Sequence, residues 1–115
     1  MRENDEEQRA MEARFRGLIV RWRLSPSETA ALLDVDRDLL GLDLVPRAVD
    51  GNTEYRMRLL LEIGSFITTV CVVEESWSWL RSNELSLEHA RSSPLQFLTG
   101  SISNLRAFRS MLIHA

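Results

Sequence analysis

The chain contains no lysine, so all 14 of its basic side chains are arginines, set against 17 acidic ones in 115 residues. The formal net charge of −3 argues against a protein whose whole surface follows a phosphate backbone, although a local basic patch remains compatible with it. Apolar residues make up 44% of the chain, which at this length is enough for one modest core and too little for two substantial domains.

Cysteine and long hydrophobic runs are equally scarce. The single cysteine, Cys71, excludes an intramolecular disulfide, suits a reducing compartment and is expected in the core. Residues 1–14 hold no uninterrupted apolar run, and the later apolar stretches are broken by Glu62, Glu74 and Glu75. We therefore expect a cytoplasmic protein without a signal peptide or a membrane-spanning segment.

Residues that carry catalytic chemistry are few and scattered. The two histidines, His89 and His114, are far apart, and no His or Cys cluster has the spacing of metal ligands. The five glycines are dispersed, which excludes both a phosphate-binding loop and a dinucleotide-binding fingerprint. The sequence therefore predicts no metal and no organic cofactor, and it indicates a protein that is not an enzyme.

Apolar residues recur at helical spacing along the chain and predict an all-α fold, a small single-domain helical bundle. The first predicted helix covers residues 6–23. The second begins at a capping box formed by Ser25 and Glu28, with Pro26 at its first position. A tight break then leads to a short third helix that Asp36 would cap.

The second half of the chain begins with a long central helix that starts at Asn52 or Thr53 and runs for about 22 residues without proline. Its β-branched run at 67–73 could be a strand by propensity alone, but it continues the helical spacing and has no partner strand. The remaining predicted helices lie at about 77–81, from the cap Ser93 and the first residue Pro94 to Gly100, and from about Ser103 onward, with a loop at 84–92.

The second and third predicted helices have the proportions of a DNA-binding helix-turn-helix. The third, however, would present three aspartates beside the single Arg37, and acidic groups repel phosphate. The first helix is more cationic at its end, where Arg21 and Arg23 lie. Contact of these three arginines with a DNA backbone stays open beside the simpler interpretation of a solvated arginine face.

Trp77 and Trp79 are two residues apart, which on a helix places their rings about 200 degrees from each other. They cannot share one face. One ring can enter the core beside Leu80, whereas the other needs a second buried surface, a dimer contact or a partner. Burial of both rings inside one domain remains the alternative.

Several short elements, in their order and spacing over about residues 12–113, resemble the Xre/MbcA/ParS antitoxin family. They are Leu24-Ser25, Glu28, Ala31-Leu32-Leu33, Arg58 to Leu61, Ile63, Trp79-Leu80, Asn83, Ser93-Pro94-Leu95, Gly100, Leu105-Arg106, Arg109 and Leu112. The resemblance implies a helix-turn-helix-like region at 1–50, degenerate here because "LLGLDLV" replaces the family's polar pair, and a toxin-binding region at 51–115, packed as one domain.

The resemblance also implies a function. The chain would be the antitoxin of a type II toxin–antitoxin system, dimeric, and would bind a RES-type toxin that consumes NAD so that the toxin's active-site cleft is occluded. Trp79 with Leu80 would anchor the core, and Trp77 would face the partner. A transcriptional repressor that binds its operator is the alternative. The residues then expected at the toxin interface are Trp77, Trp79, Ser93, Pro94, Gly100, Arg106, Arg109 and His114.

Overall fold

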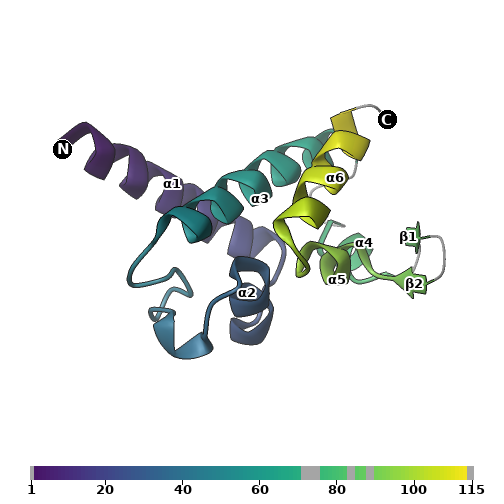
Figure 1. The fold of residues 1–115 in the computed structure, drawn as a ribbon, viewed down its shortest axis with the longest axis horizontal. Helices are drawn as coiled ribbons and strands as arrows, with labels where there is room; N and C mark the ends of the chain where they lie inside the picture. Colours follow the sequence, from purple (N-terminus) through teal and green to yellow (C-terminus); the bar gives the residue numbers. More distant parts are fainter. Residues whose placement is uncertain (1, 71–75, 83–84, 88–89, 114–115) are drawn as a thin grey trace.

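The computed structural model describes residues 2–70, 76–82, 85–87 and 90–113, so Cys71, His89 and His114 lie outside the described residues. The predicted all-α fold is confirmed for a small helical domain (Figure 1). Its elements are α1 (Arg2–Arg21), α2 (Pro26–Leu33), the 3-10 turn η1 (Arg37–Leu39), α3 (Gly51–Val70), α4 (Ser76–Leu80), β1 (Leu85–Leu87), β2 (Ala90–Ser92), α5 (Pro94–Leu98) and α6 (Ile102–Ile113).

The two 20-residue helices α1 and α3 cross each other, and α6 packs along α3 (Figure 1). Gly64 of α3 makes the crossing possible, because a Cβ atom there would lie 2.6 Å from Leu18 Cδ1. The predicted long central helix is confirmed as far as Val70, so residues 67–70 are helical and not a strand. The rest of that β-branched run, 71–73, is outside the described residues.

One apolar core joins the two predicted regions, 1–50 and 51–115. The predicted apolar face of the first helix is confirmed, since its five residues Met11, Phe15, Leu18, Ile19 and Trp22 are all buried. Each large apolar side chain removed from water contributes about 1.5 to 3 kcal/mol to folding. The partners of this face include Leu32, Leu33, Met57, Leu60, Ile63, Ile67, Leu80, Leu98, Leu105 and Phe108.

The predicted capping box at the start of α2 is confirmed. Ser25 Oγ accepts a hydrogen bond from the backbone N–H of Glu28 at 3.1 Å, and Glu28 Oε1 accepts one from the N–H of Ser25 at 2.8 Å. Pro26 occupies the first turn. At its other end α2 stops at Asp34, whose left-handed φ of 55° turns the chain away from the helix.

The predicted short third helix is confirmed only as the three-residue 3-10 helix η1, which begins after Asp36, and no α-helix forms between α2 and α3. Asp36 stands at the start of η1 but makes no side-chain capping bond. The backbone groups that would bond within a helix bond across a compact loop instead. The N–H of Gly41 donates to the carbonyl of Val45 at 2.8 Å, and the N–H of Arg47 donates to the carbonyl of Leu39 at 2.9 Å. A recognition helix of the helix-turn-helix kind is therefore missing between α2 and α3, a segment that the structure describes in full.

A short hairpin replaces the loop expected at 84–92. Strands β1 and β2 are antiparallel, and Leu85 pairs with Ser92, Ser86 with Arg91 and Leu87 with Ala90. The sequence between the strands has neither glycine nor asparagine, so the usual signal of a tight hairpin turn is missing. None of the described helices has the combination of length and apolar composition that crossing a membrane requires.

Candidate functional site

Trp79 belongs to the core side of α4. Its half-buried ring packs against the core cluster, with its centroid 6.3 Å from that of Phe108 and the two ring planes tilted by 57°. This is a favourable edge-to-face geometry for two aromatic rings. Leu80 beside it is fully buried. The expectation that Trp79 and Leu80 anchor this segment to the core is confirmed.

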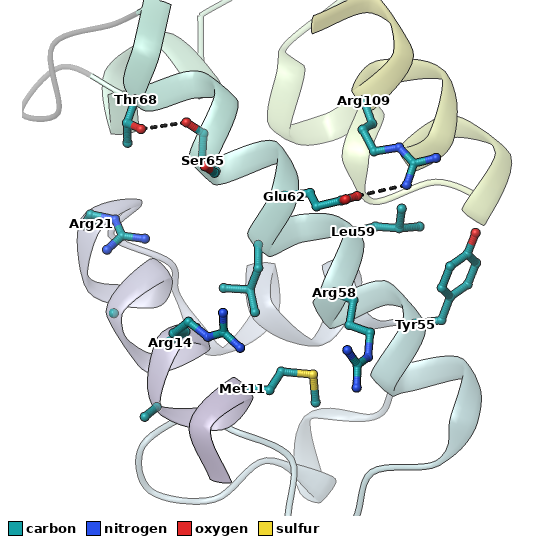
Figure 2. Close-up of a pocket in the computed structure, with 14 residues that line it drawn as sticks. Met11, Arg14, Arg21, Tyr55, Arg58, Leu59, Glu62, Ser65, Thr68 and Arg109 are labelled. Atoms are coloured by element: carbon teal, nitrogen blue, oxygen red, sulfur yellow. Dashed lines mark hydrogen bonds and ion pairs between the residues drawn. The ribbon is translucent and has the colours of Figure 1, made fainter. Parts of the chain in front are cut away.

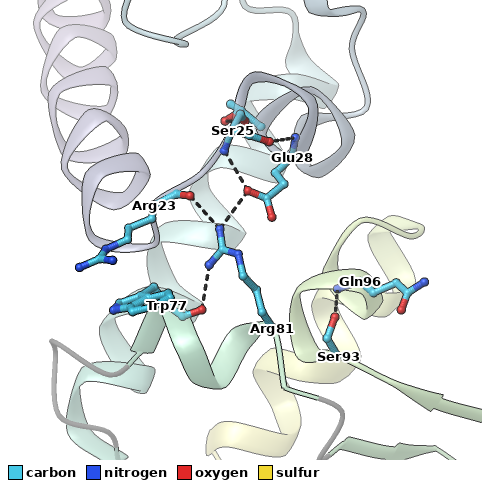
Figure 3. Close-up of polar contacts among 8 residues, drawn as sticks. Arg23, Ser25, Glu28, Trp77, Arg81, Ser93 and Gln96 are labelled. Carbon is cyan, nitrogen blue, oxygen red and sulfur yellow. Dashed lines mark hydrogen bonds and ion pairs between the residues drawn. The ribbon is translucent and has the colours of Figure 1, made fainter.

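Trp77, on the other side of α4, has a partner inside its own chain. The guanidinium carbon of Arg23 lies 4.1 Å from the centroid of the Trp77 ring (Figure 3). A cation over an aromatic face at a partly exposed site contributes about 0.5 to 1 kcal/mol. Arg23, expected to contact DNA, thus covers the ring that was expected to face a protein partner.

Arg81 joins the same place to the start of α2, and we call the group Arg23, Glu28, Trp77 and Arg81 the Arg81 clamp (Figure 3). The guanidinium of Arg81 donates to the carbonyl of Trp77 at 2.8 Å, to the carbonyl of Arg23 at 2.8 Å and to Glu28 Oε1 at 2.9 Å. These bonds tie α4 to the turn between α1 and α2. Arg81 was not singled out from the sequence, because two of its three partners, Arg23 and Glu28, lie more than 50 residues away.

Glu28 is ionised at neutral pH in this clamp. Partial burial acts to raise the pKa of its carboxyl, but the backbone N–H of Ser25 and the guanidinium of Arg81 outweigh burial and leave the pKa below its usual value. The carboxylate of Glu28 therefore serves two elements at once, as part of the α2 cap and as the anion of the clamp.

Ser93 and Pro94 organise the start of α5. Ser93 Oγ accepts from the backbone N–H of Gln96 at 3.1 Å, and Pro94 is buried in the first turn, as the sequence predicts. The helix ends with Thr99 in the capping position, one residue before the predicted Gly100. The observed role of Ser93 and Pro94 is thus to orient the chain that leads to α6.

Gly100 lies at the corner between α5 and α6, where a Cβ atom would overlap the side chain of Asn104. Its carbonyl accepts a hydrogen bond from Arg56 at 2.8 Å. Arg56 is only 2% exposed and also donates to the carbonyl of Leu32 at 2.8 Å. Burial lowers the pKa of Arg56, and the carboxylate of Asp34 opposes that effect. This arginine links α3 to the end of α2 and to the α5–α6 corner.

The helix α6 has one face in the core and one in solvent. Leu105 and Phe108 are buried, whereas Arg106 is exposed and makes no hydrogen bond or ion pair with any described residue. Arg109 forms an ion pair with Glu62 of α3, at 2.9 Å. Thus, of the two arginines expected to bind a toxin, one is free at the surface and the other is held against α3.

A groove lies beside α3, bounded by α1 on one side and Arg109 of α6 on the other (Figure 2). Four arginines line it, and among its described lining residues the only acidic one is Glu62. We call it the arginine groove. It is open, offers about 920 Å³ and is lined by Met11, Ala13, Arg14, Gly17, Arg21, Tyr55, Arg58, Leu59, Leu61, Glu62, Gly64, Ser65, Thr68 and Arg109.

The arginines of the groove differ in how far they are neutralised. Arg58 pairs with Glu54 at 2.8 Å, and Arg109 pairs with Glu62. Arg14 and Arg21 are exposed and form no ion pair with a described residue. The α1 side of the groove therefore carries positive charge that no described acidic residue compensates. Arginines in the sequence pointed to this helix, but only the fold brings α3 and α6 beside it.

The three arginines expected to contact DNA have different surroundings. Arg21 lines the arginine groove, Arg23 covers Trp77, and Arg37 donates to Ser27 Oγ at 3.2 Å beside η1. Arginines that contact one DNA backbone together would need to lie on a common surface. The different surroundings of these three do not provide such a surface.

Within the described ranges, no three or more His, Cys, Asp or Glu side chains gather as they would around a metal ion. Comparison with protein-family models, with curated proteins and with solved structures gives no match. The resemblance to the antitoxin family therefore stays a prediction from the sequence.

Proposed function

We propose that this chain is the antitoxin of a type II toxin–antitoxin system. It acts in the cytoplasm by contact and not by catalysis, and it neutralises a RES-type toxin that consumes NAD by covering the toxin's active-site cleft. The observation that carries the proposal is the presentation of α6, which is anchored along one face and offers a mixed basic and apolar face to a partner.

The anchoring of α6 comes from several elements. Leu105 and Phe108 are in the core, Arg56 holds the carbonyl of Gly100, and Arg109 pairs with Glu62. A helix that is already held in place loses little conformational entropy when it binds, so more of the contact energy appears as affinity. This suits a segment whose task is to block a cleft.

The offered face of α6 has the chemistry for such a contact. Arg106, Ser110 and Ile113 are exposed and lie four and three residues apart, so they form one stripe. The planar guanidinium of Arg106 can donate two parallel hydrogen bonds to a carboxylate or to other polar groups in a cleft. Met111 and Ile113, 47% and 51% exposed, add apolar surface near the end of the helix.

The direct test coexpresses this chain with the product of its adjacent reading frame, which the proposal expects to be a RES-type protein. We expect growth and cellular NAD to be maintained, and the purified proteins to bind each other in calorimetry. The double substitution Arg106→Glu with Ile113→Asp is expected to weaken binding by about a hundredfold, as the loss of central contacts does in other interfaces. NAD would then fall in the coexpressing cells.

A matched control is available on η1, where Arg37→Glu with Leu39→Asp also changes one arginine and one aliphatic residue, and Leu39 and Ile113 are both 51% exposed. This variant is expected to bind as the wild type does. Equal losses in the two variants, or no binding between the wild-type proteins, would contradict the proposal.

The repressor alternative is tested on the chain's own promoter. A gel shift that appears without the toxin, weakens as salt rises and is lost in Arg21→Ala with Arg23→Ala would favour it. Because Arg23 also covers Trp77, thermal unfolding of the same variant must be recorded to separate lost contact from lost stability.

A further inference from the structure

We infer that the arginine groove binds helix α1 of a second copy of this chain, so that two copies pair through antiparallel α1 helices. The resemblance implies a dimer but not the surface through which it forms. The inference names that surface, and it does not depend on the proposed binding of a toxin.

The first argument is the distribution of charge along α1 and the turn that follows it. Residues 2–12 hold five acidic and two basic residues, whereas residues 13–23 hold four arginines and no acidic residue. Two such helices repel each other when parallel, because like ends meet. They attract when antiparallel, because the acidic half of each helix lies along the basic half of the other.

The second argument is that the charged residues share one face. Glu7, Arg14 and Arg21 are spaced by seven residues, and Ala10 and Gly17 lie between them at the intervening positions of a heptad. Arg14, Gly17 and Arg21 line the arginine groove. The stripe that faces the groove therefore continues toward the N-terminus through Ala10 and Glu7, which are exposed. The small residues Ala10 and Gly17 allow a second helix to come close.

The third argument is that residues 6–10 of α1 have little cover from the rest of their own chain. All five are exposed, and Met11, which follows them, is buried. In Figure 1 the first half of α1 projects away from the rest of the molecule. Short helices without tertiary contacts are marginal in water, so a second surface that packs on this half would stabilise it.

The arginine groove is complementary to that half. Arg14 and Arg21 carry charge that no described residue neutralises, while Leu61 and the ring of Tyr55 provide apolar surface elsewhere in the groove. If the two-fold axis passes near Ala13, Glu7 of one copy lies opposite the segment between Arg14 and Arg21 of the other. Symmetry repeats the contact, so both grooves are filled at once.

The test is the molecular mass of the full chain in solution, measured by light scattering and sedimentation over a range of concentrations. We expect a dimer that weakens as salt rises from about 0.05 to 0.5 M, because these charges are exposed and screened. Glu6→Arg with Glu7→Arg, and separately Arg14→Glu with Arg21→Glu, should each raise the dimer dissociation constant about tenfold or more, since every substitution occurs twice.

Mixing the two reversed variants gives the decisive result. Each acidic half then meets a basic one again, so a heterodimer of near wild-type affinity is expected. Arg9→Glu, an exposed change on another face of α1, is the control and should leave the dimer unchanged. Circular dichroism at a low concentration, where the wild type is also monomeric, should show wild-type helix content for all of these exposed variants, which separates lost pairing from lost folding.

Three outcomes would overturn the inference: a wild-type chain that is monomeric throughout, reversed variants that dimerise as well as the wild type, or a mixture that forms no heterodimer. A groove that serves nucleic acid instead would bind it less well after Arg14→Glu with Arg21→Glu and better after Glu6→Arg with Glu7→Arg. Because neither result involves the toxin, neutralisation can succeed or fail independently.

Discussion

Arg56 and Arg81 each connect distant segments of the chain, which we call joints, but the two side chains differ in how exposed they are. Arg56 is 2% exposed and donates to two backbone carbonyls, those of Leu32 and Gly100. Arg81 has a side chain that is 28% exposed and donates to two carbonyls and to the carboxylate of Glu28. The same forked group thus serves a more buried joint, which links α3 to the end of α2 and to the α5–α6 corner, and a more exposed joint at the Arg81 clamp.

Because the two arginines make similar numbers of hydrogen bonds, access of solvent is expected to decide how much each contributes to the free energy of unfolding. When a buried donor is removed, its acceptors stay desolvated and unsatisfied, and each costs about 1 to 3 kcal/mol. At a partly exposed site such as the Arg81 clamp, water can replace the lost donor, and exposed ion pairs contribute only about 0 to 1 kcal/mol. We therefore expect Arg56 to be structural and the clamp to be adjustable.

The largest effect is expected from Arg56→Met, which keeps much of the side-chain volume but leaves both carbonyls without a donor. We expect the free energy of unfolding to fall by about 3 kcal/mol, measured by urea denaturation. Arg58→Met, an exposed position two residues later, should cost less than about 0.5 kcal/mol. Similar losses in the two variants would contradict a special role for Arg56.

A smaller loss, about 1 to 2 kcal/mol, is expected from Arg81→Met, because water can reach the carbonyls of Trp77 and Arg23. A double-mutant cycle with Glu28→Gln separates the ion pair from the other bonds. We expect a coupling of about 0.5 to 1 kcal/mol between the two changes. A coupling near zero would mean that Arg81 acts only through the carbonyls.

The pH dependence of the clamp gives the next smaller effect. The pKa of Glu28 is lowered in the folded protein, so its contribution is fully present above the unfolded value near 4.5 and is lost as pH falls through the folded pKa. Glu28→Gln keeps an acceptor for the cap but removes the negative charge, so it should cost up to about 1 kcal/mol at pH 7 through the ion pair. The gap to the wild type should narrow in melts recorded below the unfolded value, and a constant gap would contradict this.

The sequence predicts those parts of the fold that depend on neighbours along the chain. The apolar face of α1, the capping box at Ser25 and the Ser93–Pro94 start of α5 all rest on residues within one or two turns of each other. Their signals are local, so helical spacing and capping chemistry are sufficient to find them.

The contacts between distant segments could not be predicted in the same way. Arg23 and Trp77 are 54 positions apart, and nothing near either residue indicates the other. Arg56 is an intermediate case, because it precedes Leu60 by one helical turn and so occupies a position of the buried stripe of α3. A charge at such a position indicates a buried joint, although not the carbonyls that it binds.

The smallest expected changes in stability come from substitutions of Arg23, which separate its backbone conformation from its contact with Trp77. Its φ of 50° is a left-handed conformation that costs a residue with a Cβ about 1 kcal/mol, and its guanidinium covers Trp77. Arg23→Ala removes the cover and keeps the backbone cost, so we expect a loss of about 0.5 to 1 kcal/mol. Arg23→Gly removes both, so its unfolding free energy should lie close to that of the wild type. Both variants should uncover Trp77 equally to acrylamide quenching. If glycine proved no more stable than alanine, the turn would not be strained, and the ring contact alone would explain why an arginine at this position stabilises the clamp.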